Sequence, residues 1–117
     1  PYTTLFRSFN NNGKINAKLY YSNELDKITY IEWKVIRENM QEVFTNIIKY
    51  SKAKNVKVNV EVLNTLIKVE IKDNGIGCFR MEKGLGLSGI EERTMNLNGK
   101  VIFDGSSGFS VIMLFPI

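Results

Sequence analysis

The chain contains no histidine and a single cysteine, Cys78, and both shortages exclude particular kinds of chemistry. Without histidine there is no imidazole to act as a general base, to bind a metal or to accept a phosphoryl group. Without a second cysteine there is neither an internal disulfide nor a zinc site built from cysteines. No apolar run approaches the ~20 residues that are needed to span a bilayer. We therefore expect no membrane contact by this chain.

What the chain does contain is the composition of one ordinary globular domain. Its 117 residues are 44% hydrophobic and 24% charged, which suits a single domain with a real core. The net charge of +4 is a mild excess that favours an anionic ligand, but it is too small to predict nucleic acid as a partner. The chain begins with Pro1, and we expect it to be a piece of a longer protein. Residues 1–12 read as a linker or N-terminal extension, and residues 13–117 as the domain.

The pattern of apolar residues predicts both strands and helices. Residues 14–21 alternate as a half-buried strand with Ile15, Ala17, Leu19 and Tyr21 on one face. Residues 30–52 have the spacing of a long helix whose apolar stripe faces the core. The stripe consists of Ile31, Val35, Ile36, Met40, Val43, Phe44, Ile47 and Ile48.

The second half of the chain predicts a sheet with one more helix. Residues 56–62 and 66–72 alternate as two strands of a hairpin. A short helix is expected from about residue 90 to a stop at Asn98-Gly99, and two further strands over 100–104 and 109–115. This order favours an α/β (α+β) two-layer sandwich, with a mixed, mostly antiparallel sheet packed on helices.

Three polar residues of the long helix are the first candidate site. Glu42, Asn46 and Lys49 are spaced so that they share one stripe beside the apolar face. A carboxylate, an amide oxygen and an ammonium in that arrangement suit a hydrated cation together with phosphates, since Mg²⁺ prefers oxygen ligands and keeps several waters. On spacing alone, the same residues also fit a plain solvated helix surface.

The second candidate site follows the hairpin. Asp73 stands at the end of a strand and is followed by Gly75 and Gly77. Such an aspartate can offer its carboxylate to an amino group in a pocket, and the glycines allow the backbone to approach a flat ligand closely. A plain turn is the alternative, because Asp, Asn and Gly are common turn residues.

The third candidate is a glycine-rich segment with Gly84, Gly86 and Gly89. Backbone N–H groups in such a loop, leading into a helix, can bind an anion. With Asp104 twenty residues later, the segment also imitates a dinucleotide-binding fingerprint. That interpretation requires an apolar strand immediately before the first glycine, and residues 78–83 do not form one.

The order of these three segments resembles the ATP-binding module of the GHKL superfamily, which includes gyrase, Hsp90, histidine kinases and MutL. Within it the chain looks like the catalytic ATP-binding domain of a bacterial sensor histidine kinase, with a Bergerat-type fold. Residues 41–50 match the N box, 73–77 the first Gly box, and 84–93 the second Gly box with its following helix. The short segment 78–83 resembles the short-lid kinases.

The resemblance implies a role for each matched residue. Asn46 would bind the Mg²⁺ of Mg-ATP, Glu42 would lie beside the metal and its waters, and Lys49 would face the phosphates as the third catalytic residue. Asp73 would accept a hydrogen bond from the adenine amino group. The remaining nucleotide-binding positions are Gly75 and Gly77 along the base pocket, Gly84 and Gly86 at the lid hinge, and Leu87 after them.

The resemblance also implies an activity and its partners. The domain would donate the γ-phosphoryl group of ATP to a histidine on a separate dimerisation domain of the same kinase, and the phosphate would then pass to a response regulator. The resemblance implies a cytoplasmic location for this domain. The longer parent protein can be anchored in a membrane through another part of its chain. Two departures, Tyr50 where many relatives carry His and Phe109 where many carry Thr, motivate an alternative, a non-catalytic nucleotide-binding module. A Ser/Thr kinase of the anti-sigma type is a further alternative.

Overall fold

A computed structural model describes residues 16–22, 24–47, 54–75, 87–105 and 108–117. The elements are β1 (Asn16–Tyr21), a 3-10 turn η1 (Leu25–Lys27), α2 (Tyr30–Asn46), β2 (Asn55–Val62), β3 (Leu66–Asp73), α3 (Leu87–Met95), β4 (Lys100–Asp104) and β5 (Ser110–Pro116). None of the helices in these ranges is long and apolar enough to cross a membrane.

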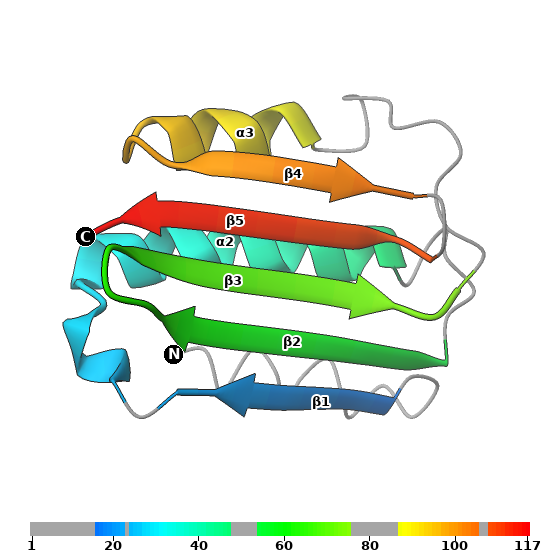
Figure 1. Ribbon diagram of the computed structural model, residues 1–117. Coiled ribbons are helices and arrows are strands. Elements are labelled where there is room, and N and C mark those ends of the chain that lie inside the picture. Colours follow the sequence, from blue (N-terminus) through cyan, green and yellow to red (C-terminus); the bar gives the residue numbers. More distant parts are fainter. Residues whose placement is uncertain (1–15, 23, 48–53, 76–86, 106–107) are drawn as a thin grey trace.

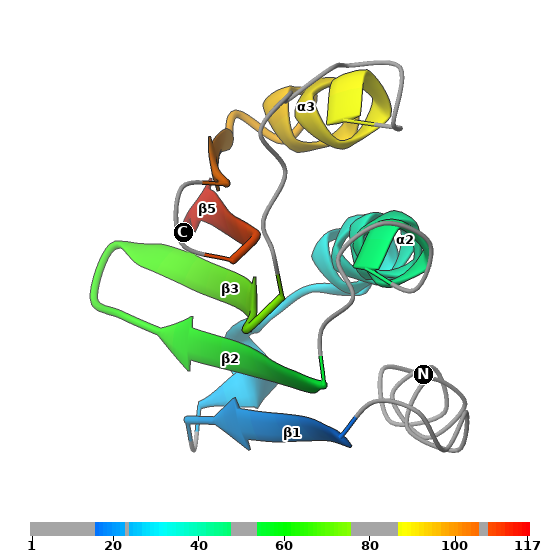
Figure 2. The same ribbon diagram turned by 90° about the vertical axis from the view of Figure 1, so that its right-hand side faces the viewer.

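The described strands form one five-stranded sheet in the order β1-β2-β3-β5-β4 (Figure 1). β1 pairs with β2 in parallel, whereas β2 with β3, β3 with β5, and β4 with β5 are antiparallel. Figure 2 shows α2 and α3 on the same face of this sheet. The expected two-layer sandwich with a mixed, mostly antiparallel sheet is therefore confirmed.

The core lies between the sheet and the two helices, as the alternation in the strands requires. β2 and β3 bury every second residue, and α2 contributes one stripe to the same cluster. The apolar core positions of α2 and α3 are Ile36, Met40, Val43, Phe44, Leu87 and Ile90, with Ile47 directly after α2.

Local sequence explains where α2 begins. Thr29 is the N-cap, and its side-chain oxygen accepts a hydrogen bond from the backbone N–H of Glu32. The Glu32 carboxylate in turn accepts one from the backbone N–H of Thr29 at 2.8 Å. This reciprocal capping box satisfies two backbone donors that a helix start leaves without partners. The helix was expected to extend to residue 52, and residues 48–52 lie outside the described residues.

Two residues expected in the core are instead exposed. Ile31 is 61% exposed because, at about 100° per residue, it lies about 140° around α2 from the buried Ile36. Tyr21 is 58% exposed at the last position of the edge strand β1, although Ala17 on that strand is buried as predicted. The predicted apolar stripe of α2 and the predicted buried face of β1 therefore each included one terminal residue that is exposed.

The predicted stop after α3 is present, but its two residues do different things. Asn98 adopts a positive φ of 60°, the left-handed conformation that follows many helices. Gly99 is buried, and a Cβ there would lie 2.5 Å from the carbonyl oxygen of Leu114 in β5. Gly99 is therefore required by the close approach of α3 and β5.

The topology brings several element ends to one end of the molecule. The carboxyl ends of α2 and β3 lie there together with the start of α3 and the start of β5 (Figures 1 and 2). Asn46, Asp73 and Leu87 are the terminal residues of the first three of these elements. Asn46 and Asp73, two polar residues far apart in sequence, thus lie at the same end of the sandwich.

Candidate functional site

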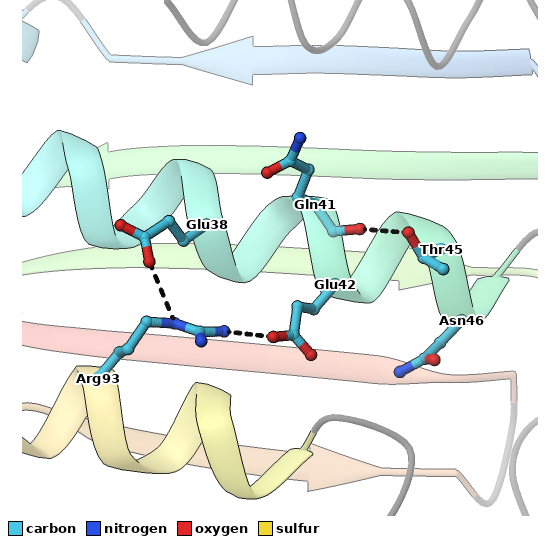
Figure 3. Close-up of a pocket in the computed structure, with 6 residues that line it drawn as sticks. All are labelled: Glu38, Gln41, Glu42, Thr45, Asn46 and Arg93. Carbon is cyan, nitrogen blue, oxygen red and sulfur yellow. Dashed lines mark hydrogen bonds and ion pairs between the residues drawn. The ribbon is translucent and has the colours of Figure 1, made fainter.

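A pocket lies between α2 and α3, with a volume of about 450 Å³. Five lining residues come from α2 and the sixth, Arg93, from α3 (Figure 3). The lining residues are Glu38, Gln41, Glu42, Thr45, Asn46 and Arg93. Glu42 and Asn46, predicted from their spacing to share a stripe, line the same pocket.

Arg93 connects the two helices across this pocket. Its Nη2 donates a hydrogen bond of 2.9 Å to Oε1 of Glu42, and its Nε lies 3.9 Å from Oε2 of Glu38 (Figure 3). The Arg93 and Glu42 side chains are 26% and 36% exposed, so solvent weakens the attraction only in part. The guanidinium thus makes one close contact to Glu42 and a longer one to Glu38.

Asn39 forms a buried polar link under this ion pair. Its side chain is fully buried, and its Oδ1 accepts a hydrogen bond of 2.9 Å from Nε of Arg93. Its Nδ2 donates to Oγ1 of Thr94 at 3.0 Å and lies 3.3 Å from Sδ of Met113. Because an unpaired buried amide costs about 1–3 kcal/mol, these partners explain how a polar residue is tolerated within the apolar stripe.

Gly89 lies directly beside the ion pair. A Cβ at this position would lie 3.1 Å from Nη1 of Arg93 and 3.5 Å from Oε1 of Glu42. Gly89 precedes Arg93 by one helical turn, so the two share a face of α3. The absence of a side chain at residue 89 leaves room for the guanidinium to reach α2.

The Asp73 carboxylate is buried at the end of β3, with 2% of the residue exposed. Its Oδ1 accepts hydrogen bonds from the backbone N–H of Gly75 at 2.8 Å and of Phe109 at 3.1 Å. Its Oδ2 is also buried and has no hydrogen-bonding partner among the described residues. One carboxylate oxygen is therefore held by the backbone, and the other is a buried acceptor that a ligand could satisfy.

The segment before β5 holds Asp73 in place from the other side. The backbone N–H of Asp73 donates to the carbonyl of Phe109 at 3.0 Å, which complements the bond from Phe109 to the carboxylate. The Phe109 ring itself is buried in the core. At this position the backbone, and not the side chain, contacts the predicted site.

Asn74 joins the same loop to the start of β2. Its Oδ1 accepts hydrogen bonds from the backbone N–H groups of Lys54 at 3.0 Å and Asn55 at 2.9 Å. Its own backbone N–H donates to the carbonyl of Asn55 at 3.1 Å. The turn after Asp73 is therefore tied to the neighbouring strand.

The remaining predicted site residues divide into two groups. Leu87 opens α3 with its side chain buried in the core, so only its backbone could face a ligand. The predictions for Lys49, Gly77, Gly84, Gly86 and the short segment 78–83 fall outside the described residues. Within the described ranges, no cluster of three or more His, Cys, Asp or Glu side chains could hold a metal ion by itself.

Sequence reasoning assigned no role to Arg93 or Asn39. A signal was present for each: Asn39 is a polar residue inside the apolar stripe of α2, and Arg93 follows Gly89 by one helical turn. Neither signal identifies the partner of the residue. Arg93 bonds to Asn39 across 54 residues and to Glu42 across 51, and local spacing does not report such distant contacts.

Comparison with known proteins places the chain among kinases. No family model matches it. It is 28% identical over 106 residues to the sensor histidine kinase YvfT of Bacillus subtilis, which covers 90% of this chain. It is 36% identical over 83 residues to the signal transduction histidine-protein kinase/phosphatase DegS of Brevibacillus brevis, which covers 67% of this chain. The chain therefore belongs to the histidine kinase family.

The solved structures agree with this assignment at the level of the fold. The catalytic domain of the histidine kinase ThkA aligns with 97% of this chain and 86% of its own length, with a TM-score of 0.75 and 19% identity. At that identity the likeness shows the fold alone. The histidine kinase domain described here spans 29% of YvfT and 22% of DegS, less than a third of either relative.

Proposed function

We propose that this histidine kinase domain binds Mg-ATP and donates the γ-phosphoryl group to a histidine outside the chain. The observation that carries the proposal is the buried Oδ2 of Asp73, an acceptor without a partner among the described residues. A buried acceptor of this kind costs free energy until a donor reaches it.

The adenine base offers such a donor. The edge of adenine carries an amino group, whereas guanine has a carbonyl oxygen at the corresponding position. An ionised carboxylate can only accept hydrogen bonds, so Asp73 would bind adenine and repel guanine. Because Oδ1 is already held by Gly75 and Phe109, Oδ2 is the oxygen that would select the base.

The pocket between α2 and α3 fits a magnesium ion with phosphates. The amide oxygen of Asn46 and the carboxylate of Glu42 are oxygen ligands of the kind that Mg²⁺ takes, and one such residue suffices when phosphates and waters complete the shell. ATP supplies the phosphoryl group to be transferred. The protein's part is to orient the nucleotide and neutralise charge, which is how phosphoryl transfer is catalysed in general.

The acceptor must come from elsewhere, because the chain contains no histidine. The relatives are named as histidine kinases, which supports a histidine on a dimerisation domain as the acceptor. A response regulator would then receive the phosphoryl group. A location in the cytoplasm, where ATP and the regulator are available, accompanies this proposal.

Calorimetric titration of the chain with ATP tests the proposal. We expect ATP to bind in the micromolar to low millimolar range, more tightly with Mg²⁺. GTP should bind about 5- to 150-fold more weakly, because one misplaced buried hydrogen bond costs about 1–3 kcal/mol. The Asp73→Asn variant keeps an oxygen for Gly75 and Phe109 but turns a donor towards the base. It should stay folded and lose ATP binding.

Equal binding of ATP and GTP, or unchanged binding by Asp73→Asn, would contradict the proposal. A second measurement uses γ-labelled ATP with the chain alone. No label should be transferred to the protein, since the acceptor is absent. Acid-stable label on a serine or threonine of an added protein would instead support the Ser/Thr kinase alternative.

A further inference from the structure

We propose that Arg93 is a positioning residue that fixes the Glu42 carboxylate in the pocket, and that Asn39 in turn fixes Arg93. The inference rests on the proposed function, in which Glu42 lies beside the bound metal ion and its waters. It adds a hydrogen-bonded series of three residues on two helices, in which Asn39 and Arg93 orient Glu42 without contacting the metal ion themselves.

The guanidinium of Arg93 uses two different nitrogens for two different partners. Nη2 binds Glu42 and Nε binds Asn39, each at 2.9 Å. Donors in a planar guanidinium have fixed relative directions, so the position of one partner determines the position of the other. A lysine at residue 93 would carry the same charge but lacks this rigid fork, and it could not satisfy both partners in the same geometry.

Asn39 is a rigid support for this fork. Arginine can only donate hydrogen bonds, so the oxygen of the Asn39 amide must face Arg93 and its NH₂ group must face Thr94. Thr94 is fixed as well, because its Oγ1 donates to the carbonyl of Ile90 at 2.7 Å. The Asn39 side chain is fully buried, so turning it would break bonds that water cannot replace.

Gly89 leaves the space that the ion pair of Arg93 and Glu42 occupies. The 3.1 Å distance from a Cβ at residue 89 to Nη1 is tighter than ordinary contact, so a methyl group would displace the guanidinium by a few tenths of an ångström. The arrangement therefore depends on the absence of a side chain at residue 89.

The consequence for the site is a Glu42 side chain with one defined orientation. Its Oε1 is held by α3, while the carboxylate as a whole remains at the surface of the pocket that Asn46 also lines. Residues that orient metal-site groups from outside typically change metal affinity or activity by 10–100-fold when they are replaced.

The test compares ATP affinity with and without Mg²⁺ for the chain and its Arg93→Lys variant. The charge is unchanged, so a purely electrostatic role predicts little effect. We expect the gain in affinity on adding Mg²⁺ to fall by about 10-fold, with the metal-free ATP affinity within about twofold of the parent. Arg37→Lys, on the same helix as Glu42 but outside the pocket, is the matched control and should leave the Mg²⁺ gain unchanged.

A double-mutant cycle with Glu42→Gln shows whether Arg93 acts through Glu42. The effect of Arg93→Lys on the Mg²⁺ gain should vanish in the Glu42→Gln background. Gly89→Ala, which retains all three polar residues but displaces the guanidinium, should reduce the gain by a smaller factor and should have no further effect once Arg93 is lysine. This variant also serves if Arg93→Lys does not fold.

The ¹⁵N NMR signal of the Arg93 Nε–H group gives a readout without nucleotide. Its exchange with water should be slow in the parent chain and should accelerate in Asn39→Ala. An Arg93→Lys variant with an unchanged Mg²⁺ gain, or an equal loss in the Glu42→Gln background, would overturn the inference. Absence of Asp73-dependent ATP binding by the parent chain would instead overturn the proposed function, on which this inference depends.

Discussion

Gly108 lies against the backbone of Asp73 so closely that a side chain has no place between them. A Cβ at residue 108 would lie 2.3 Å from the carbonyl oxygen of Asp73 and 3.4 Å from its Oδ1. Gly108 also has a positive φ of 75°, which glycine adopts without strain. The buried carboxylate and the turn before β5 are therefore built as one unit.

Replacing Gly108 with alanine should damage both stability and nucleotide binding. The left-handed conformation costs an alanine about 1–2 kcal/mol, and displacement of the Asp73 backbone adds to that. We expect the free energy of unfolding in urea to fall by more than about 2 kcal/mol, with weaker ATP binding. Asn98→Ala places an alanine at a similar φ without adding a Cβ, so it is the control that introduces no new backbone contact. Equal losses in the two variants would show that the contact with Asp73 is unimportant.

Asn98→Gly should stabilise the domain slightly. Asn98 pays for its positive φ of 60°, and glycine adopts that conformation more readily. The greater freedom of glycine in the unfolded chain offsets part of this gain, so an increase of up to about 1 kcal/mol in the free energy of unfolding is expected. Asn98→Val should have the opposite effect. A stabilising valine would contradict the assigned conformation.

Asn74→Ala should weaken the attachment of the Asp73 loop to β2. The substitution removes the acceptor for the N–H groups of Lys54 and Asn55, and we expect a loss of about 1 kcal/mol in the free energy of unfolding. Asn74→Asp keeps the acceptor oxygen and should stay within about 0.5 kcal/mol of the parent. Denaturant unfolding of the three proteins decides between these values, and a larger loss for aspartate than for alanine would refute the role given to Oδ1.

Bound nucleotide should raise the stability of the domain by mass action. At a ligand concentration of 100 times the dissociation constant, the free energy of unfolding should increase by about 2.7 kcal/mol. Thermal unfolding with Mg-ATP, with Mg-GTP and with EDTA measures this effect. Asp73→Asn should show none of the ATP-dependent increase. An equal increase from GTP would mean that Asp73 does not select the base.

The sequence predicted the fold well where the signal is periodic. The alternation in β2 and β3 and the apolar stripe of α2 each depend on burial of one face, and a period of two or 3.6 residues reports burial directly. The predicted burial of Ile31 and Tyr21 was wrong, because periodicity does not show where the core ends. The buried positions of α2 begin at Ile36 and not in its first turn, and β1 is an edge strand.

The site was predictable only in part, for a different reason. Glu42 and Asn46 lie four residues apart on one helix, and the geometry of a helix is sufficient to bring them into one pocket. Arg93 reaches the pocket through tertiary packing of α3 on α2, which no local spacing encodes. Phe109 contributes a backbone N–H group, and any residue except proline has one. The roles of Lys49 and of the glycines in 77–86 stay predictions.

The place of β5 in the sheet has a consequence for the synthesis of this protein. β5 is the last strand along the chain, yet it lies between β3 and β4 and pairs with both. While a ribosome is still translating the preceding residues, β3 has one open edge and β4 has no neighbour. The Asp73 carboxylate also lacks the hydrogen bond from the N–H group of Phe109 until Phe109, directly before β5, has been synthesised. The sheet and the backbone hydrogen bonds to the Asp73 carboxylate are therefore completed together, so a prematurely terminated chain should have neither.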